Sequence, residues 1–294
     1  MKIFYHDDMD GVVSAFCVNN LRQFHDNRIT EMISMDYTKK FPIKTVRKNE
    51  IVYIVDFSIK PREMDGLLEI TKNVTWIDHH ETAINLYQNL DAAAHIDGIR
   101  KVGYSGAMLT HVYMTNLTLG GVGKILEWDD KYAEKAPLFI RLVDDYDCWK
   151  GKMEPSTTAF KLWWDAQNIG PKDDRLLYIS EGTILNTAIP YGKSIKSYID
   201  AQNKYHLDSA SYEAIFDGHK CLVCNRKANS WLFGDRINDY DFCVTSVFNG
   251  KQWTYTLYSV KEDIHVGEIC KQHGGGGHKG AAGFTNIHNI FLRI

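Results

Sequence analysis

Short apolar runs alternate with amphipathic stretches in the N-terminal part of the chain. Residues 3–5 form the first run, and residues 12–21 after it have the spacing of a helix. The runs at 51–55 and 74–77 are continuous, which is typical of strands buried on both faces of a parallel sheet. Strands that alternate with helices at this interval predict a parallel α/β sheet. Two further helices are expected, over residues 105–115 and 131–144.

The pattern changes after about residue 150. Polar residues with helical spacing at 191–206 predict a connecting helix. Residues 252–258 alternate between apolar and polar side chains, as a half-buried antiparallel strand does, and Asn249 and Gly250 before them form a strong hairpin signal. The expected strands cover residues 220–224, 242–248 and 253–260, and a short helix covers 266–272.

These two patterns divide the chain into domains, and its 294 residues agree with two domains at about 150 residues each. We predict an α/β fold with an N-terminal parallel-sheet domain over residues 1–185. A connecting helix and linker would cover 186–212, and a smaller α+β domain would cover 213–294.

Composition restricts the classes of function. A formal net charge of −3 argues against a protein that coats long nucleic acids, because such proteins carry a strong basic excess. A short anionic substrate remains compatible with this charge. No run approaches the roughly 18 apolar residues of a membrane helix, and the start of the chain lacks the apolar stretch of a signal peptide. The six scattered cysteines favour a reducing compartment, so we expect a cytoplasmic location without a membrane.

Polar side chains that can bind metals follow all three N-terminal apolar runs. His6, Asp8 and Asp10 follow the first run, Asp56 follows the second, and residues 78–80 follow the third. The carboxyl ends of parallel strands share one edge, so these side chains would meet there. Carboxylates gathered in one place repel one another unless a cation compensates them. Asp and His ligands without Cys suit Mn²⁺, with Mg²⁺, Co²⁺ or Zn²⁺ as substitutes.

Each of these segments has a simpler interpretation when it is taken alone. The segment from His6 to Asp10 would be a polar turn with an Asp helix cap, and an isolated Asp56 after a strand would be an ordinary loop residue. The coincidence of three such strand ends is what favours a metal site.

The same residues resemble the motifs of the DHH phosphoesterase family. The triplet Asp78, His79 and His80 follows an apolar run, as in that family, and residues 6–11 and 55–56 match its other N-terminal motifs. The glycine run and the following residues, 274–284, resemble the substrate-binding motif of the DHH-associated domain. The two signatures lie in the expected order and cover nearly the whole chain. Residues 105–107 and 146–149 are most similar to the subgroup of oligoribonucleases (nanoRNases) and cyclic-nucleotide phosphodiesterases.

This resemblance implies two divalent metal ions, with Asp56 as the ligand that they share. The fourth motif offers three carboxylates within residues 144–147. We take Asp147 as the ligand and keep Asp144 as the alternative. The implied ligands are His6 and Asp8 for one ion, and Asp10, His79 and Asp147 for the other.

The resemblance also implies how the substrate is held. His80 would face the phosphate instead of binding metal, and Asp78 would accept a hydrogen bond that orients an imidazole. In the glycine run, backbone N–H groups would approach an anion closely. A solvated loop is an equally good interpretation of Arg100. The expected substrate contacts are Gly275, Gly276, Gly277, His278, Arg100 and Arg226.

Together these roles predict a two-metal, Mn²⁺-dependent phosphodiesterase. It would hydrolyse short oligoribonucleotides, dinucleotides or small cyclic nucleotides, with its active site in the cleft between the domains. The alternatives are a phosphomonoesterase for a nucleotide such as 3′-phosphoadenosine phosphate, and a non-catalytic nucleotide-binding protein. The full ligand set argues against the binding protein, since binding alone does not need it. The sequence leaves open the cleavage polarity, the native metal and the oligomeric state.

Overall fold

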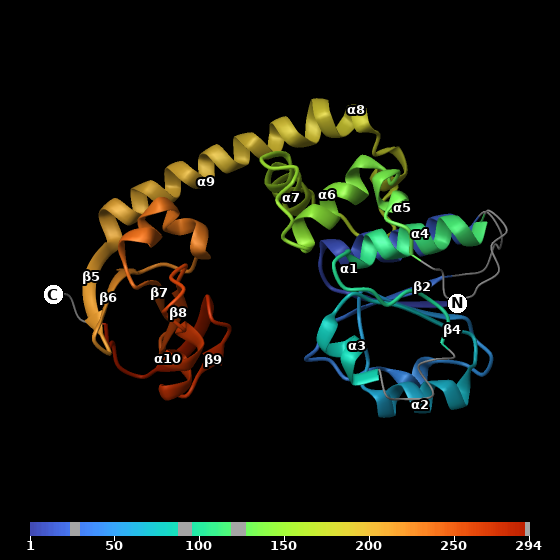
Figure 1. Cartoon of the computed structure of the whole chain (residues 1–294), viewed down its shortest axis with the longest axis horizontal. Coiled ribbons are helices and arrows are strands. Elements are labelled where there is room, and N and C mark those ends of the chain that lie inside the picture. The colour runs from blue at the N-terminus through green and yellow to red at the C-terminus, as the bar shows by residue number, and fades with distance from the viewer. Residues whose placement is uncertain (24–29, 88–95, 119–127, 292–294) are drawn as a thin grey trace. The chain divides into compact units, whose positions relative to one another are not determined.

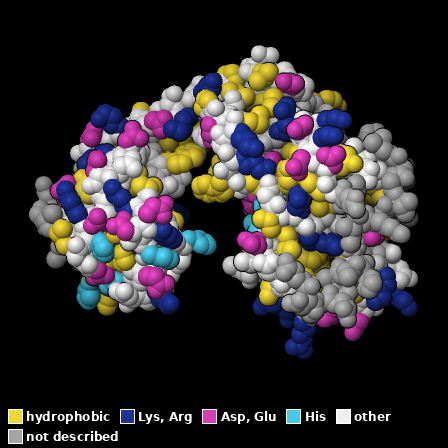
Figure 2. Space-filling view, viewed as in Figure 1, with side chains coloured by type: hydrophobic (Ala, Val, Ile, Leu, Met, Phe, Trp, Pro, Cys, Tyr) yellow, Lys and Arg dark blue, Asp and Glu magenta, His cyan; other side chains and the backbone are white. Residues whose placement is uncertain are grey.

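The chain forms two compact units in a computed structural model that describes residues 1–23, 30–87, 96–118 and 128–291 (Figure 1). The units are Met1–Ile195 and Lys196–Ile294. None of the described helices is long and apolar enough to cross a membrane. On the visible face of each unit, Lys and Arg side chains are interspersed with Asp and Glu (Figure 2). The mixture agrees with the near-neutral charge of the sequence.

A four-stranded parallel sheet lies at the centre of the first unit (Figure 1). Ile54 pairs with Phe4 on one side and with Trp76 on the other, which fixes the register of three adjacent strands. The parallel order brings the carboxyl ends of all the strands to one edge of the sheet. In spatial order the strands are β2 (Glu31–Met35), β1 (Lys2–His6), β3 (Val52–Val55) and β4 (Val74–Ile77).

Alternate side chains of these strands pack into two hydrophobic cores, one on each face. In β3, Tyr53 and Val55 belong to one core, and Val52 and Ile54 belong to the other. Figure 1 shows α1 and α4 on one face of the sheet and α2 and α3 on the other. This arrangement confirms the predicted α/β fold. The first core includes α1 (Met9–Gln23), α4 (Gly106–Thr118), α6 (Leu138–Asp147) and α7 (Ser156–Gln167), and the second includes α2 (Pro61–Ile70) and α3 (Glu81–Tyr87).

Two local expectations for the first unit need correction. The helix predicted over 131–144 is two helices, α5 (Lys131–Glu134) and α6. Pro137 lacks an N–H and disfavours helical geometry in the residue before it, so it separates the two helices and precedes α6. The edge strand β2 was not predicted, because only Met35 of its residues is buried and the segment lacks a continuous apolar run.

Of the remaining helical segments, η1 (Ile43–Thr45) lies between β2 and β3, and the others lead from α7 to the second unit. The helix predicted over 191–206 is present as α9, which crosses the boundary between the two units. The predicted limits of the domains stay a prediction. The segments are η1 (Ile43–Thr45), η3 (Asp174–Tyr178), α8 (Glu181–Thr183), η4 (Ile184–Ala188) and α9 (Ile189–Ala210).

The second unit contains a mixed six-stranded sheet in the order β5-β6-β7-β8-β10-β9. Only β6 and β7 are parallel neighbours, and the other pairs are antiparallel. Gly250, with a φ of +90°, turns the predicted hairpin between β7 and β8. The predicted α+β character is therefore confirmed. The elements are β5 (Ser211–Phe216), β6 (His219–Cys224), η5 (Ser230–Leu232), η6 (Gly234–Asp239), β7 (Phe242–Phe248), β8 (Trp253–Tyr258), α10 (Val266–Gln272), β9 (Gly276–Gly277) and β10 (Ala281–Asn286).

Candidate metal centre

Asp56 lies at the centre of the carboxyl edge of the parallel sheet. It follows β3 directly, with its N–H donating to the Ile77 carbonyl at 2.9 Å. Its φ of +53° lies in the left-handed region, which Asp tolerates better than most residues do. The side chain is 1% exposed, and neither carboxylate oxygen accepts a hydrogen bond from a described residue.

The two oxygens of Asp56 face different histidines. Oδ2 lies 3.8 Å from Nδ1 of His6, and Oδ1 lies 3.1 Å from Nε2 of His79. A buried carboxylate without donors is unfavourable unless a cation compensates it. Asp56 is therefore placed to share its two oxygens between two positive partners.

His6 and Asp8 form the group on one side of Asp56. Nδ1 of His6 lies 2.7 Å from Oδ2 of Asp8, and Oδ1 of Asp8 accepts the N–H of Gly11 at 2.9 Å. Asp8 thus caps α1, as the simpler interpretation expected, and also belongs to the cluster. A Cβ on Gly11 would lie 2.0 Å from the His6 carbonyl oxygen, so the tight turn requires glycine.

Asp10 and His79 lie on the other side of Asp56. Oδ2 of Asp10 lies 3.7 Å from Nε2 of His79. The buried Asp10 carboxylate accepts the N–H groups of Gly106 and Ala107 at 2.7 and 2.8 Å, at the start of α4. A Cβ on Gly106 would lie 2.5 Å from the Asp56 Cβ, so glycine lets α4 approach the centre.

The structure distinguishes the three carboxylates of the fourth motif. Asp144 accepts the N–H of Ser105 at 2.8 Å and pairs with Lys150 Nζ at 2.6 Å. Asp145 accepts the backbone N–H groups of residues 152 and 153, at 2.8 and 3.1 Å. Asp147 instead places Oδ2 3.4 Å from Nε2 of His79. Asp147, and not Asp144, therefore lies in the cluster.

His80 is oriented by Asp78. The Asp78 carboxylate is fully buried, and its Oδ1 lies 2.7 Å from Nδ1 of His80 and accepts the N–H of His79 at 2.8 Å. Ser58 Oγ donates to the other oxygen of Asp78. The imidazole that Asp78 orients is thus that of His80. Asp56, His79 and His80 each offer an atom within 4.8 Å of the others, so the geometry also permits His80 as a ligand.

The electrostatics of the centre reflect its crowded carboxylates. Burial, and then the charges of Asp10 and Asp8, raise the pKa of Asp56 well above its usual value. The same causes, in the same order, raise the pKa of Asp147 to about 8. Burial lowers the pKa of His79, which favours the neutral imidazole that a metal needs. A divalent cation would relieve the repulsion, and oxygen and imidazole donors fit such an ion.

The two predicted arginine contacts have different surroundings. Arg100 Nη1 donates to the carbonyls of Trp76 and Asp97, both at 3.1 Å, and its guanidinium lies 5.3 Å from the centre of the Trp76 ring. These contacts attach Arg100 to the sheet. In the second unit, Nη1 of Arg226 is buried and has no hydrogen-bond partner among the described residues.

The glycine run of the second unit forms part of a strand pairing. Gly276 and Gly277 pair with β10, and a Cβ on Gly275 would lie 2.1 Å from the Gly283 carbonyl oxygen. The exposed His278 donates its N–H to Ala281 at 2.8 Å. The glycine backbone therefore packs closely against β10, while its expected approach to an anion and its role in substrate binding stay predictions.

Sequence reasoning missed two side chains near the centre. Tyr37 follows β2, and its ring centre lies 5.7 Å from that of His6 and 6.1 Å from that of His80. No apolar run marked β2, so no signal pointed to the residue after its end. Cys148 forms a possible ligand group with His79 and Asp147, but burial raises the pKa of its thiol to about 12.

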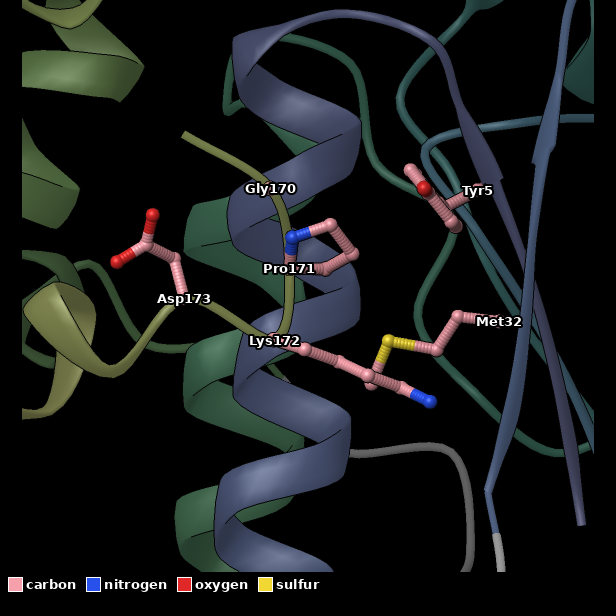
Figure 3. A pocket seen from close by; sticks show the side chains of 6 residues that line it. All are labelled: Tyr5, Met32, Gly170, Pro171, Lys172 and Asp173. Carbon is pink, nitrogen blue, oxygen red and sulfur yellow. The ribbon is translucent and has the colours of Figure 1, made fainter. Parts of the chain in front are cut away.

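A pocket of the first unit lies elsewhere. It has a volume of about 450 Å³ and is lined by residues of β1, β2 and the loop 170–173 (Figure 3). Lys172 of that loop lies beside Met32 and donates to the Thr30 carbonyl at 3.1 Å. None of the clustered carboxylates or histidines lines this pocket. The polar cluster, and not this cavity, marks the candidate site.

Comparison with known proteins identifies similar folds. No protein-family profile matches the chain. The structure is similar to the pGpG-specific phosphodiesterase PggH of Vibrio cholerae, with a TM-score of 0.54 and 11% identity over 97% of this chain and 92% of that one. RecJ of Thermus thermophilus, solved with Mn²⁺, gives a TM-score of 0.45 and 16% identity over 96% of this chain and 49% of that one.

A curated viral protein is similar in sequence. The chain is 24% identical over 254 residues, 81% of its length, to the uncharacterized protein R106 of Acanthamoeba polyphaga mimivirus. It spans 53% of that relative, about half its length. The similarity to PggH over nearly the whole chain confirms the fold that the resemblance to DHH phosphoesterases predicted.

The raised pKa of Asp147 predicts how the stability of the metal-free protein depends on pH. The folded-state pKa of about 8 exceeds the unfolded value of about 3.9, so the folded state holds this proton more tightly. This contribution is complete below pH 4 and is lost as the pH rises towards 8. Between pH 5 and 8, Tm measured in chelator should fall roughly 10 °C more for the wild type than for Asp147→Asn, since one pKa unit corresponds to about 1.4 kcal/mol.

Asp65→Asn, which changes an exposed carboxylate on α2, provides the matched control and should follow the wild type. If Tm falls equally with pH in the wild type and in Asp147→Asn, the electrostatic account of the cluster is contradicted.

Proposed function

We propose that the protein is a metal-dependent phosphodiesterase of the DHH type that cleaves dinucleotides and short oligoribonucleotides. The observation that carries this proposal is the buried Asp56 carboxylate, which lacks hydrogen-bond donors among the described residues and lies between two His–Asp groups. The fold shared with a phosphodiesterase of a dinucleotide supports the same reaction class.

In this proposal the cluster holds two divalent ions, with Mn²⁺ as the expected metal. When bound, such ions activate a water and compensate the charge that grows on the phosphoryl oxygens. The protein's own contribution is to fix the donors beforehand. Asp8 is held by Gly11, and Asp10 is held by the start of α4. The proposed ligands are His6 and Asp8 for one ion, Asp10, His79 and Asp147 for the other, and Asp56 for both.

His80 is proposed to contact the phosphate and to donate a proton to the leaving oxygen. Asp78 holds Nδ1 of the ring, so Nε2 is the nitrogen left for the substrate. Burial has the largest single effect and opposes the charged imidazole, but the hydrogen bond to Asp78 and the charges of Asp78, Asp147 and Asp10 together outweigh it and raise the pKa of His80. A raised pKa favours the protonated form that acts as a general acid.

The second unit is proposed to select the substrate. Backbone N–H groups of Gly275, Gly276 and Gly277, together with His278, would bind a phosphate or terminal nucleotide remote from the scissile bond. The buried and unpartnered Nη1 of Arg226 makes it a further candidate for this contact. Such remote binding energy positions the scissile bond and raises kcat/KM for substrates of the right length.

Hydrolysis of a defined set of substrates tests this function. With Mn²⁺, the wild type should cleave pApA, pGpG and short oligomers, because the ions held by the cluster would compensate the charge on a phosphodiester group. Asp56→Asn should lower the rate by at least about 10²-fold while the fold stays intact, and chelator should abolish the activity of the wild type. Asp65→Asn should remain fully active. Cleavage of 3′-phosphoadenosine phosphate alone would assign a phosphomonoesterase instead, and activity in excess chelator would exclude the metal mechanism.

Substitution of the two adjacent histidines separates metal binding from substrate contact. His79→Ala should lower the number of ions per chain, because it removes a ligand next to Asp56 and Asp10. His80→Ala should keep the ions and lose kcat, because it removes a contact made in the transition state. Elemental analysis of both variants, combined with steady-state kinetics, measures the two effects. An equal loss of metal in both variants would show that His80 is also a ligand.

A further inference from the structure

Tyr37 presents an aromatic surface at the candidate centre that the roles assigned so far do not use. Its ring lies 5.7 Å from His6, which belongs to the metal cluster, and 6.1 Å from His80, the proposed phosphate contact. The residue is nevertheless 58% exposed. One part of the ring therefore packs on the site while the rest of it faces solvent.

The packing around Tyr37 fixes the position of this ring. Phe57 is buried next to Asp56, and its ring centre lies 5.0 Å from that of Tyr37 at an interplanar angle of 31°. His80 meets the Tyr37 ring edge-on at 80°. Contacts with three rings restrict the motion of the side chain, so little further ordering is needed when a ligand packs on it.

The turn that carries Tyr37 is also held in place. Asp36 accepts the N–H of Thr38 at 2.8 Å and pairs with Lys39 Nζ at 3.0 Å. Lys39 Nζ also lies 3.9 Å from the carboxylate of Asp7, which precedes the metal-cluster residue Asp8. These contacts connect the turn after β2 to the turn after β1.

The charge of Tyr37 suits a position beside a phosphate. An ordinary phenol has a pKa of about 10, so the tyrosine ring is neutral at physiological pH. A neutral aromatic ring neither repels a phosphate nor competes with the carboxylates for a metal. It offers a π-face on which any base can stack.

We propose that Tyr37 stacks on the nucleobase next to the scissile phosphate and so makes this site selective for nucleotides over other phosphate esters. This inference rests on the proposed function and identifies the substrate class through one contact. The base of a nucleotide is one sugar away from its phosphate. A ring that packs on both His6 and His80 lies where the base would be when the phosphate reaches those residues.

Equilibrium binding tests the stacking without relying on turnover. Calorimetric titration of the Mn²⁺-loaded protein compares guanosine 5′-monophosphate with ribose 5-phosphate, which lacks the base. The wild type should bind the nucleotide about tenfold more tightly, in the range expected for one stacked base. Tyr37→Ala should remove that preference and Tyr37→Phe should retain it. Tyr178→Ala, at another exposed tyrosine of the first unit, should bind like the wild type.

Two binding results would overturn the inference. If Tyr37→Ala keeps the preference for the nucleotide, the ring does not contact the base. If the variant loses affinity for ribose 5-phosphate as strongly as for the nucleotide, Tyr37 acts by positioning His6 and His80.

Kinetics separate this inference from the proposed function. On pGpG, Tyr37→Ala should lower kcat/KM about tenfold. On an abasic analogue of pGpG, which lacks the base beside the scissile phosphate, the variant should match the wild type. Hydrolysis of pGpG by the wild type with no effect of Tyr37→Ala would overturn the role of Tyr37 alone. If the wild type hydrolyses no dinucleotide at all, the proposed function fails, and the binding titration still decides whether Tyr37 contacts a base.

Discussion

The uncompensated burial of the Asp56 carboxylate is the constraint on which the candidate site depends. Its oxygens are inaccessible to solvent and accept no hydrogen bond from a described residue, and the nearby carboxylates of Asp10, Asp8, Asp147 and Asp78 all raise its pKa. Such an arrangement is unfavourable in the absence of a cation, because each negative charge raises the cost of the next. The surrounding backbone nevertheless holds it in place. The fold therefore maintains a site whose electrostatics are completed by a positive ligand.

Glycine and backbone donors make this crowding possible. Gly11 and Gly106 stand where a Cβ would collide with the His6 carbonyl or the Asp56 side chain. The N–H groups of Gly106 and Ala107 fix the Asp10 carboxylate, and Gly11 fixes that of Asp8. A carboxylate held by backbone donors keeps further lone pairs for an ion. The donors thus orient the cluster without neutralising it.

Much of this site could be predicted from the sequence, because its residues follow strands with a clear apolar pattern. His6, Asp56 and His79 follow or end such strands, and the rule that parallel strands share a carboxyl edge brings them together. The start of α4 could not be predicted to hold Asp10, since that contact joins residues 96 positions apart. Tyr37 was missed because its strand lies at the sheet edge and is mostly not buried. Pro137 was a local signal for the break between α5 and α6. The helical spacing of the apolar residues over 131–144 led to the prediction of one continuous helix instead.

Anomalous diffraction from crystals grown with Mn²⁺ tests the central claim most directly. The account predicts two anomalous peaks, one on each side of the Asp56 carboxylate. The first should lie near His6 and Asp8, and the second near His79 and Asp147. A single ion would restrict the cluster to one of these groups. Well-ordered crystals at saturating Mn²⁺ with no anomalous peak within coordination distance of Asp56 would contradict the account.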